Sequence, residues 1–105
     1  NPVTKEGANV VVLNATDTAG LASKAAKTLS GQGINIVETG NASVNQATTT
    51  IIDASGGQKP ATRQYLQQQY GSTITTTNPY ANTYDTDFIV VLGADKIPKT
   101  TTTKQ

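Results

Sequence analysis

The stretch Val10-Val11-Val12-Leu13-Asn14, followed directly by Ala15-Thr16-Asp17-Thr18-Ala19-Gly20-Leu21-Ala22, decides the fold. Its apolar run is about as long as one buried strand needs, and small and polar residues typical of a turn close it. Leu21, Ala25 and Leu29 then follow at a spacing of four, which predicts a helix with one narrow apolar face. The chain is therefore expected to open as strand, loop and helix.

A second apolar run lies near the other end, where Phe88-Ile89-Val90-Val91-Leu92 stops at Gly93-Ala94-Asp95. The two runs are the most continuously apolar segments, so both are expected at the centre of a sheet. Turn residues and β-branched residues between them predict further elements. These are strands over 34–38 and 48–52, a helix that begins at Pro60 and ends at Gly71, and a possible short edge strand over 72–77.

The predicted order of elements is β-α-β-β-α-β, with a possible extra strand before the last. Two helices with one-sided apolar faces favour packing on one face of a sheet. The expected fold class is therefore α/β (α+β), a two-layer sandwich with one mixed sheet. We expect residues 1–7 to be a linker, 8–97 the domain and 98–105 a disordered Thr-rich tail. Because the chain opens with Asn1-Pro2 and contains no Met, it is interpreted as a piece of a longer protein.

The composition excludes several classes of function. A net charge of +1 with no basic stripe argues against nucleic-acid binding and against a polybasic membrane surface. No apolar run could span a bilayer, so membrane contact is expected only through segments of a parent protein outside this chain. Absence of Cys excludes disulfides and thiolate metal sites. Abundant Thr, Asn and Gln are typical of exported bacterial envelope proteins, and a Cys-free chain suits a Gram-positive source.

The sequence offers little catalytic chemistry. It contains neither His nor Cys, which removes the commonest general base, metal ligand and thiol nucleophile. Asp85 and Asp87 lie two residues apart, but a solvated turn is favoured over a pair of catalytic acids. We therefore predict no enzymatic activity, no catalytic residue, no metal and no cofactor.

A polar loop with two aromatic residues is the first candidate for ligand binding. Tyr80, Asn82 and Tyr84 combine rings that could stack on sugars with an amide that could bond their hydroxyl groups. The alternative, which we favour, is that the rings anchor the loop by packing against the sheet. Both interpretations remain open from the sequence alone.

The loop after the first strand is the second candidate. Asn14 and Thr16 lie between that strand and the predicted helix, where free N–H groups can bind an anion. No phosphate-binding glycine motif is present, and Asp17 would repel a phosphate. The favoured interpretation is that Thr16, Asp17 or Thr18 caps the helix while Asn14 ties the loop to the strand. Asn41 is a further tentative ligand-binding residue.

Six short motifs, in a fixed order along the chain, carry a family resemblance. They are Val12-Leu13-Asn14-Ala15-Thr16, Gly20-Leu21-Ala22, Gly33-Ile34-Asn35-Ile36, Gly40-Asn41, Thr49-Thr50-Ile51-Ile52 and Val90-Val91-Leu92-Gly93-Ala94-Asp95. In these motifs the chain resembles the C-terminal domain of LytR/CpsA/Psr proteins, called LytR_C. The resemblance covers nearly all of the expected domain. It departs at Ala15, where many members have Gly.

The resemblance implies an extracytoplasmic accessory domain in a cell-envelope protein. Such domains follow a catalytic domain that attaches glycopolymers from lipid carriers to peptidoglycan, and none of its phosphotransfer residues maps onto this chain. The implied function is binding of cell-wall glycan or of an envelope protein, without catalysis. The alternative is a structural or protein-interaction module that positions an upstream phosphotransferase domain. A tether through an N-terminal transmembrane helix outside these residues is also implied.

Overall fold

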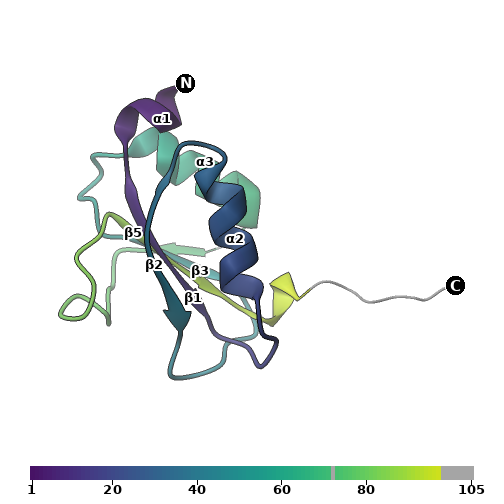
Figure 1. Cartoon of the computed structure of the whole chain (residues 1–105). Coiled ribbons are helices and arrows are strands. Elements are labelled where there is room, and N and C mark those ends of the chain that lie inside the picture. The colour runs from purple at the N-terminus through teal and green to yellow at the C-terminus, as the bar shows by residue number, and fades with distance from the viewer. Residues whose placement is uncertain (72, 98–105) are drawn as a thin grey trace, which may run out of the picture.

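The computed structural model describes residues 1–71 and 73–97, and within them it has one five-stranded sheet and helices (Figure 1). The expected tail, 98–105, lies outside the described residues. The strands are β1 (Asn9–Asn14), β2 (Asn35–Asn41), β3 (Thr50–Asp53), β4 (Thr73–Thr75) and β5 (Phe88–Leu92). The helices are α1 (Pro2–Glu6), α2 (Leu21–Ser30), α3 (Pro60–Tyr70) and the 3-10 helix η1 (Ala94–Lys96).

The sheet is mixed and has the order β2-β1-β5-β3-β4. β1 pairs in parallel with both β2 and β5, and β3 pairs in parallel with β4. β3 and β5 are antiparallel. The prediction that the two apolar runs lie centrally is confirmed, because each has a neighbour on both sides. The short strand expected over 72–77 is confirmed as the edge strand β4.

One face of the sheet is covered by α2 and α3, as predicted (Figure 1). Leu21, Ala25 and Leu29 of α2 are buried, and so are Leu66 and Tyr70 of α3. They pack against alternate strand residues that point to the same side of the pleat. Those strand residues are Val10, Val12, Ile51, Phe88, Val90 and Leu92.

The opposite face has a second core cluster, which loops cover instead of helices. Its members are the remaining strand residues together with the residue after β1, namely Val11, Leu13, Ala15, Ile52, Ile89 and Val91. Ala42, Tyr80 and Tyr84 pack against this cluster from the loops before β3 and β5. Burial on both faces explains why β1 and β5 are continuously apolar instead of alternating.

The segment expected to be a linker contains α1. The side chain of Asn1 accepts a hydrogen bond from the N–H of Val3 at 3.0 Å, Pro2 begins the helix, and Gly7 ends it at a φ of 57°. Val3 is buried in the first core cluster. Cap, proline and glycine are all helix signals in a stretch that looks merely polar.

The second strand is also longer and more exposed than expected. β2 extends to Asn41, whereas residues 40 and 41 were expected in a loop. A register shift between Val10 and Val11 leaves Val37 half exposed at the edge of the sheet. The expected division into one buried and one wetter face holds over 34–37, because Ile34 and Ile36 face the first core cluster while Asn35 and Val37 are exposed.

A carboxylate from α1 holds the start of α3. The Glu6 carboxylate accepts hydrogen bonds from the N–H groups of Ala61 and Thr62, at 2.8 and 2.7 Å, and from the Thr62 hydroxyl at 2.7 Å. The Lys59 ammonium donates to the Glu6 carbonyl oxygen at 2.6 Å. Desolvation raises the pKa of Glu6, but these hydrogen bonds and nearby Lys59 outweigh it, so the pKa lies below its ordinary value.

Replacing Glu6 by Gln should destabilise the domain by about 1–2 kcal/mol at neutral pH, because one acceptor of the α3 cap becomes a donor. The lowered pKa also means that the unfolded chain binds this proton first as the pH falls. The stability that Glu6 contributes is therefore fully present above the ordinary pKa of a glutamate. It is lost as the pH falls through the lower pKa that Glu6 has in the folded state. Urea denaturation across this range measures both effects.

The matched control for that prediction is Glu38→Gln, since Glu38 is an exposed carboxylate on β2. This variant should have nearly the stability of the wild type at neutral pH, and it should still lose stability as the pH falls. If the Glu6→Gln variant lost stability in acid as steeply as the wild type, the proposed role of this carboxylate would be wrong.

Candidate functional site

The loop between β1 and α2 is held by Asn14, which is buried. The Asn14 side-chain amide donates to the carbonyl of Thr18 at 2.8 Å, and its oxygen accepts from the N–H and hydroxyl of Thr16. The Thr16 hydroxyl in turn accepts from the N–H of Thr18 at 3.1 Å. Asn14 therefore ties the loop to the strand, as expected.

The expected side-chain cap of α2 is wrong. Gly20 is the N-cap, with a φ of 89°, and no side chain bonds to the first turn of the helix. The Thr16 hydroxyl is bonded within the loop, while the Asp17 carboxylate accepts from the Asn45 amide of the neighbouring loop at 2.9 Å. The first N–H groups of α2 consequently have no side-chain acceptor from this loop.

A cleft lies between the start of α2 and the carboxyl ends of β1 and β2. Asn14 and Asn41 are partners in the parallel pairing, and the N–H of Ala42 donates to the Asn14 carbonyl at 3.0 Å. The cleft has a volume of about 280 Å³. Its lining residues are Asn14, Ala19, Gly20, Ala22, Ser23, Thr39, Gly40 and Asn41.

The chemistry of this cleft is polar and uncharged. Asn41 supplies a side-chain amide, Thr39 and Ser23 supply hydroxyl groups, and no lining residue is ionisable. The N-terminal end of α2 adds N–H groups and the positive end of the helix dipole. Ligands in α/β proteins commonly bind at the carboxyl ends of parallel strands. The arrangement can donate to and accept from a neutral, hydroxyl-rich ligand.

Tyr80 and Tyr84 lie together on the other side of the sheet. Their ring centroids are 6.1 Å apart at an interplanar angle of 45°, and both rings are half-buried against the second core cluster. The N–H of Tyr84 donates to the Tyr80 carbonyl at 3.0 Å, and the N–H of Tyr80 donates to the Asn78 side chain at 2.9 Å. The rings therefore anchor this loop to the sheet, the arrangement favoured from the sequence.

The structure separates the candidate residues into two groups. A Cβ at Gly40 would lie 3.7 Å from the Tyr84 hydroxyl, whereas Thr39 and Asn41, its neighbours on β2, line the cleft. Neighbouring strand residues point to opposite faces, so the cleft and the tyrosines are on opposite sides of β2. Asn82 is exposed in the tyrosine loop. Ligand binding by either group remains a prediction.

Sequence reasoning missed Thr39 and Ser23 as cleft residues. Thr39 is two positions before Asn41, and this spacing in a strand puts both on one face. That signal was hidden because the strand was expected to end before Asn41. Ser23 lies in the first turn of α2, and only the parallel pairing of β1 with β2 brings it near them.

Two of the acidic residues near the ends of β5 have structural partners. The Asp87 carboxylate accepts from the N–H of Asn9 at 2.9 Å, and Asp85 is exposed beside it. Asp95 accepts from the N–H and the hydroxyl of Thr49, the latter at 2.7 Å. In the described part of the chain, no three His, Cys, Asp or Glu side chains are grouped to hold a metal ion. No helix there is long and apolar enough to cross a bilayer.

Comparisons with known proteins agree with this fold. Residues 7–95 match the family model LytR_C, described as "LytR cell envelope-related transcriptional attenuator". The solution structure of the C-terminal domain of RV0431 is similar, with a TM-score of 0.59 and 26% sequence identity over 82% of this chain and 71% of that one. Among curated proteins, none matches. The chain therefore belongs to the LytR_C family of cell-envelope proteins.

Proposed function

We propose that this domain is a non-catalytic, extracytoplasmic accessory domain that binds neutral cell-wall glycan in the cleft between α2 and β2. The observation that carries the proposal is the lining of amide and hydroxyl groups without any ionisable side chain. Sugar hydroxyl groups both donate and accept hydrogen bonds, as the Asn41 amide and the Thr39 hydroxyl do. The family's cell-envelope setting supports this class of ligand.

The size of the cleft sets how much of a glycan it holds. Its volume of about 280 Å³ lies just below the range of pockets that take drug-sized ligands, about 300–1,000 Å³. We therefore expect it to hold one sugar unit, with the rest of the polymer running over the surface. A single sugar unit that exchanges a few hydrogen bonds with water for hydrogen bonds with the protein binds weakly. The many repeated units of the wall polymer raise the overall affinity.

A pair of serine variants tests the cleft by filling it. Ser23→Leu puts a larger apolar side chain into the lining, whereas Ser30→Leu changes the same residue type at the exposed far end of α2. In pull-down with purified peptidoglycan, Ser23→Leu should reduce the bound fraction by about fivefold or more, since it displaces hydrogen bonds worth about 1 kcal/mol. Ser30→Leu should bind as the wild type does.

A second pair of variants distinguishes the cleft from the tyrosine loop. Asn41→Ala removes an exposed amide from the cleft, and Asn82→Ala removes an exposed amide from the loop. Loss of binding should follow Asn41→Ala, with a reduction of about two- to tenfold, and should not follow Asn82→Ala. The opposite result would move the site to Tyr80 and Tyr84. No retention of the wild type on peptidoglycan would contradict the glycan proposal itself.

One observation favours the alternative of a positioning module. The segment expected to be a linker is bound to α3 through Glu6 and Lys59. A segment fixed in this way would hold a preceding domain at a defined angle. Under this proposal, loosening α1 by Glu6→Gln would change the activity or localisation of a full-length parent, while glycan retention would be absent in every variant.

A further inference from the structure

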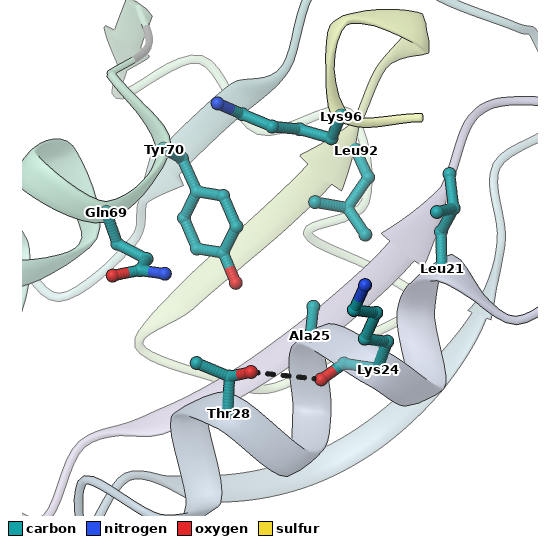
Figure 2. A pocket seen from close by; sticks show the side chains of 8 residues that line it. All are labelled: Leu21, Lys24, Ala25, Thr28, Gln69, Tyr70, Leu92 and Lys96. Carbon is teal, nitrogen blue, oxygen red and sulfur yellow. Dashed lines mark hydrogen bonds between the residues drawn. The ribbon is translucent and has the colours of Figure 1, made fainter. Parts of the chain in front are cut away.

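A second cavity lies between α2 and the end of α3, closed at one side by η1 (Figure 2). It has a volume of about 180 Å³. It shares no lining residue with the cleft, because the two occupy different sides of α2. Its lining residues are Leu21, Lys24, Ala25, Thr28, Gln69, Tyr70, Leu92 and Lys96.

The inner wall of this cavity is apolar and rigid. Leu21, Ala25 and Leu92 are buried in the first core cluster, and the Tyr70 ring is 7% exposed. An engineered apolar cavity of about 150 Å³ in another protein holds one benzene molecule. The present cavity is slightly larger and is open to solvent at its rim, so it is large enough for a single six-membered ring.

The rim of the cavity is positively charged. Lys24 and Lys96 are its ionisable lining residues apart from the Tyr70 phenol, and no carboxylate lines it. The Lys96 ammonium lies 5.9 Å from the centroid of the Tyr70 ring. The neighbouring Asp95 carboxylate is directed to Thr49 instead. Among residues 1–71 and 73–97, the one ion pair is Arg63 with Asp53, so neither lysine is neutralised by a carboxylate.

The Tyr70 side chain is compatible with a bound anion. Burial raises the pKa of Tyr70 to about 12, with a further contribution from nearby Tyr65. The phenol is therefore uncharged under ordinary conditions and does not repel a negative group. In Figure 2 its hydroxyl end points into the cavity towards α2, where the Lys24 side chain extends beside Ala25.

We propose that this cavity binds a ring-sized carboxylate, with one apolar face of the ring against Tyr70, Ala25 and Leu92 and the carboxylate beside Lys24, while Lys96 adds positive charge from the other side of Tyr70. The carboxylate supplies the acidic partner that the Lys24 ammonium lacks, and the ring fills the apolar wall. Aromatic acids and sugar acids both have this chemistry, because a pyranose ring also presents an apolar face. The site is independent of the glycan cleft and does not rest on it.

Chemical-shift mapping of the whole chain with four probes tests this inference. Benzoate and glucuronate are the two carboxylate probes, benzyl alcohol is a neutral ring of similar size, and inorganic phosphate is an anion without a ring. We expect at least one carboxylate to shift signals of α2, the end of α3 and Leu92, and to bind more tightly than benzyl alcohol and phosphate. Which carboxylate binds identifies an aromatic or a sugar acid as the source.

Lysine variants test the role of charge. Lys24→Gln should weaken carboxylate binding by about two- to fivefold, as expected for a partly exposed ion pair, and Lys96→Gln should weaken it by less than about twofold because its charge acts from farther away. Lys27→Gln is the matched control, since Lys27 is an exposed lysine of α2 outside the lining, and it should have no effect. Equal binding of benzyl alcohol, equal loss in the control, or no shifts with either carboxylate would overturn the proposal.

Discussion

Replacing Gly93 by Ala should destabilise the domain by about 3 kcal/mol or more, which is a large part of the roughly 5–15 kcal/mol that holds a domain folded. A Cβ at Gly93 would overlap the carbonyl carbon of Thr48 and lie 2.5 Å from its oxygen. These are backbone atoms, so no side-chain rotation relieves the contact. Either the segment around Thr48 or the end of β5 must move.

Hydrogen bonds also hold the segment around Thr48 close to Gly93. The N–H of Gly93 donates to the Thr49 hydroxyl at 3.0 Å, and the N–H groups of Ala94 and Asp95 donate to the carbonyls of Gln46 and Ala47. Moving these two segments apart breaks several of these hydrogen bonds together. The Gly and Asp after the last strand are therefore explained by local geometry rather than by a ligand.

Thermal and urea denaturation of Gly93→Ala measure the loss. Gly31→Ala is the control, because Gly31 has an ordinary φ of −63° and a Cβ there meets its nearest atom, the Thr28 carbonyl oxygen, at 3.4 Å. That substitution should be nearly neutral or slightly stabilising. Equal stabilities of the two variants would contradict the close approach of Thr48 to Gly93.

Replacing Phe88 by Ala should cost about 3–5 kcal/mol, because it removes the largest fully buried side chain of the core. Phe88 is the one phenylalanine of the chain and lies at the start of β5, opposite Asp53 and beside Val10. A packed core relaxes only partly around such a deletion, so much of the vacated space stays empty. Urea denaturation at neutral pH gives the loss directly.

The matched control for this prediction is Phe88→Leu, which keeps most of the apolar volume. It should cost less than about 1.5 kcal/mol, since the core keeps a side chain of similar character. If alanine and leucine at this position gave the same stability, packing around Phe88 would not be the source of the effect. A molten state of the alanine variant, with helical signal but dispersed tertiary signals lost, would agree with the prediction.

Sequence patterns predicted two kinds of element: those whose ends are marked by local residues, and strands that are buried on both faces. β1 and β5 were recognisable because continuous apolar runs need cover on both sides, and α3 because Pro60 and Gly71 mark its ends. α1 was not recognised despite its helix signals at Asn1, Pro2 and Gly7, because the contacts that hold so short a helix, such as those of Glu6 with α3, form only when the chain has folded. The sequence could not show that the Thr16 hydroxyl bonds to Asn14 and Thr18 within the loop. Because of these bonds, Thr16 does not cap α2.

The candidate site was predictable only in part for a similar reason. Asn14 and Asn41 are far apart in sequence, and their meeting depends on the parallel pairing of β1 with β2. Ser23 and Thr39 join them only because α2 crosses back over that pair. Tyr80 and Tyr84, the separate candidate, lie on the opposite face, which the single residue step from Thr39 to Gly40 shows.

The pairing of β1 with β5 has a consequence for how the domain forms. The N–H of Asn9 bonds to the side chain of Asp87, 78 residues later, and β5 lies between β1 and β3 in the sheet. During synthesis the central position therefore stays vacant until almost the whole domain has been made. Contacts so distant in sequence slow folding, because a long loop must close before they form. We expect a nascent chain that ends before Phe88 to remain unfolded and to rely on chaperones.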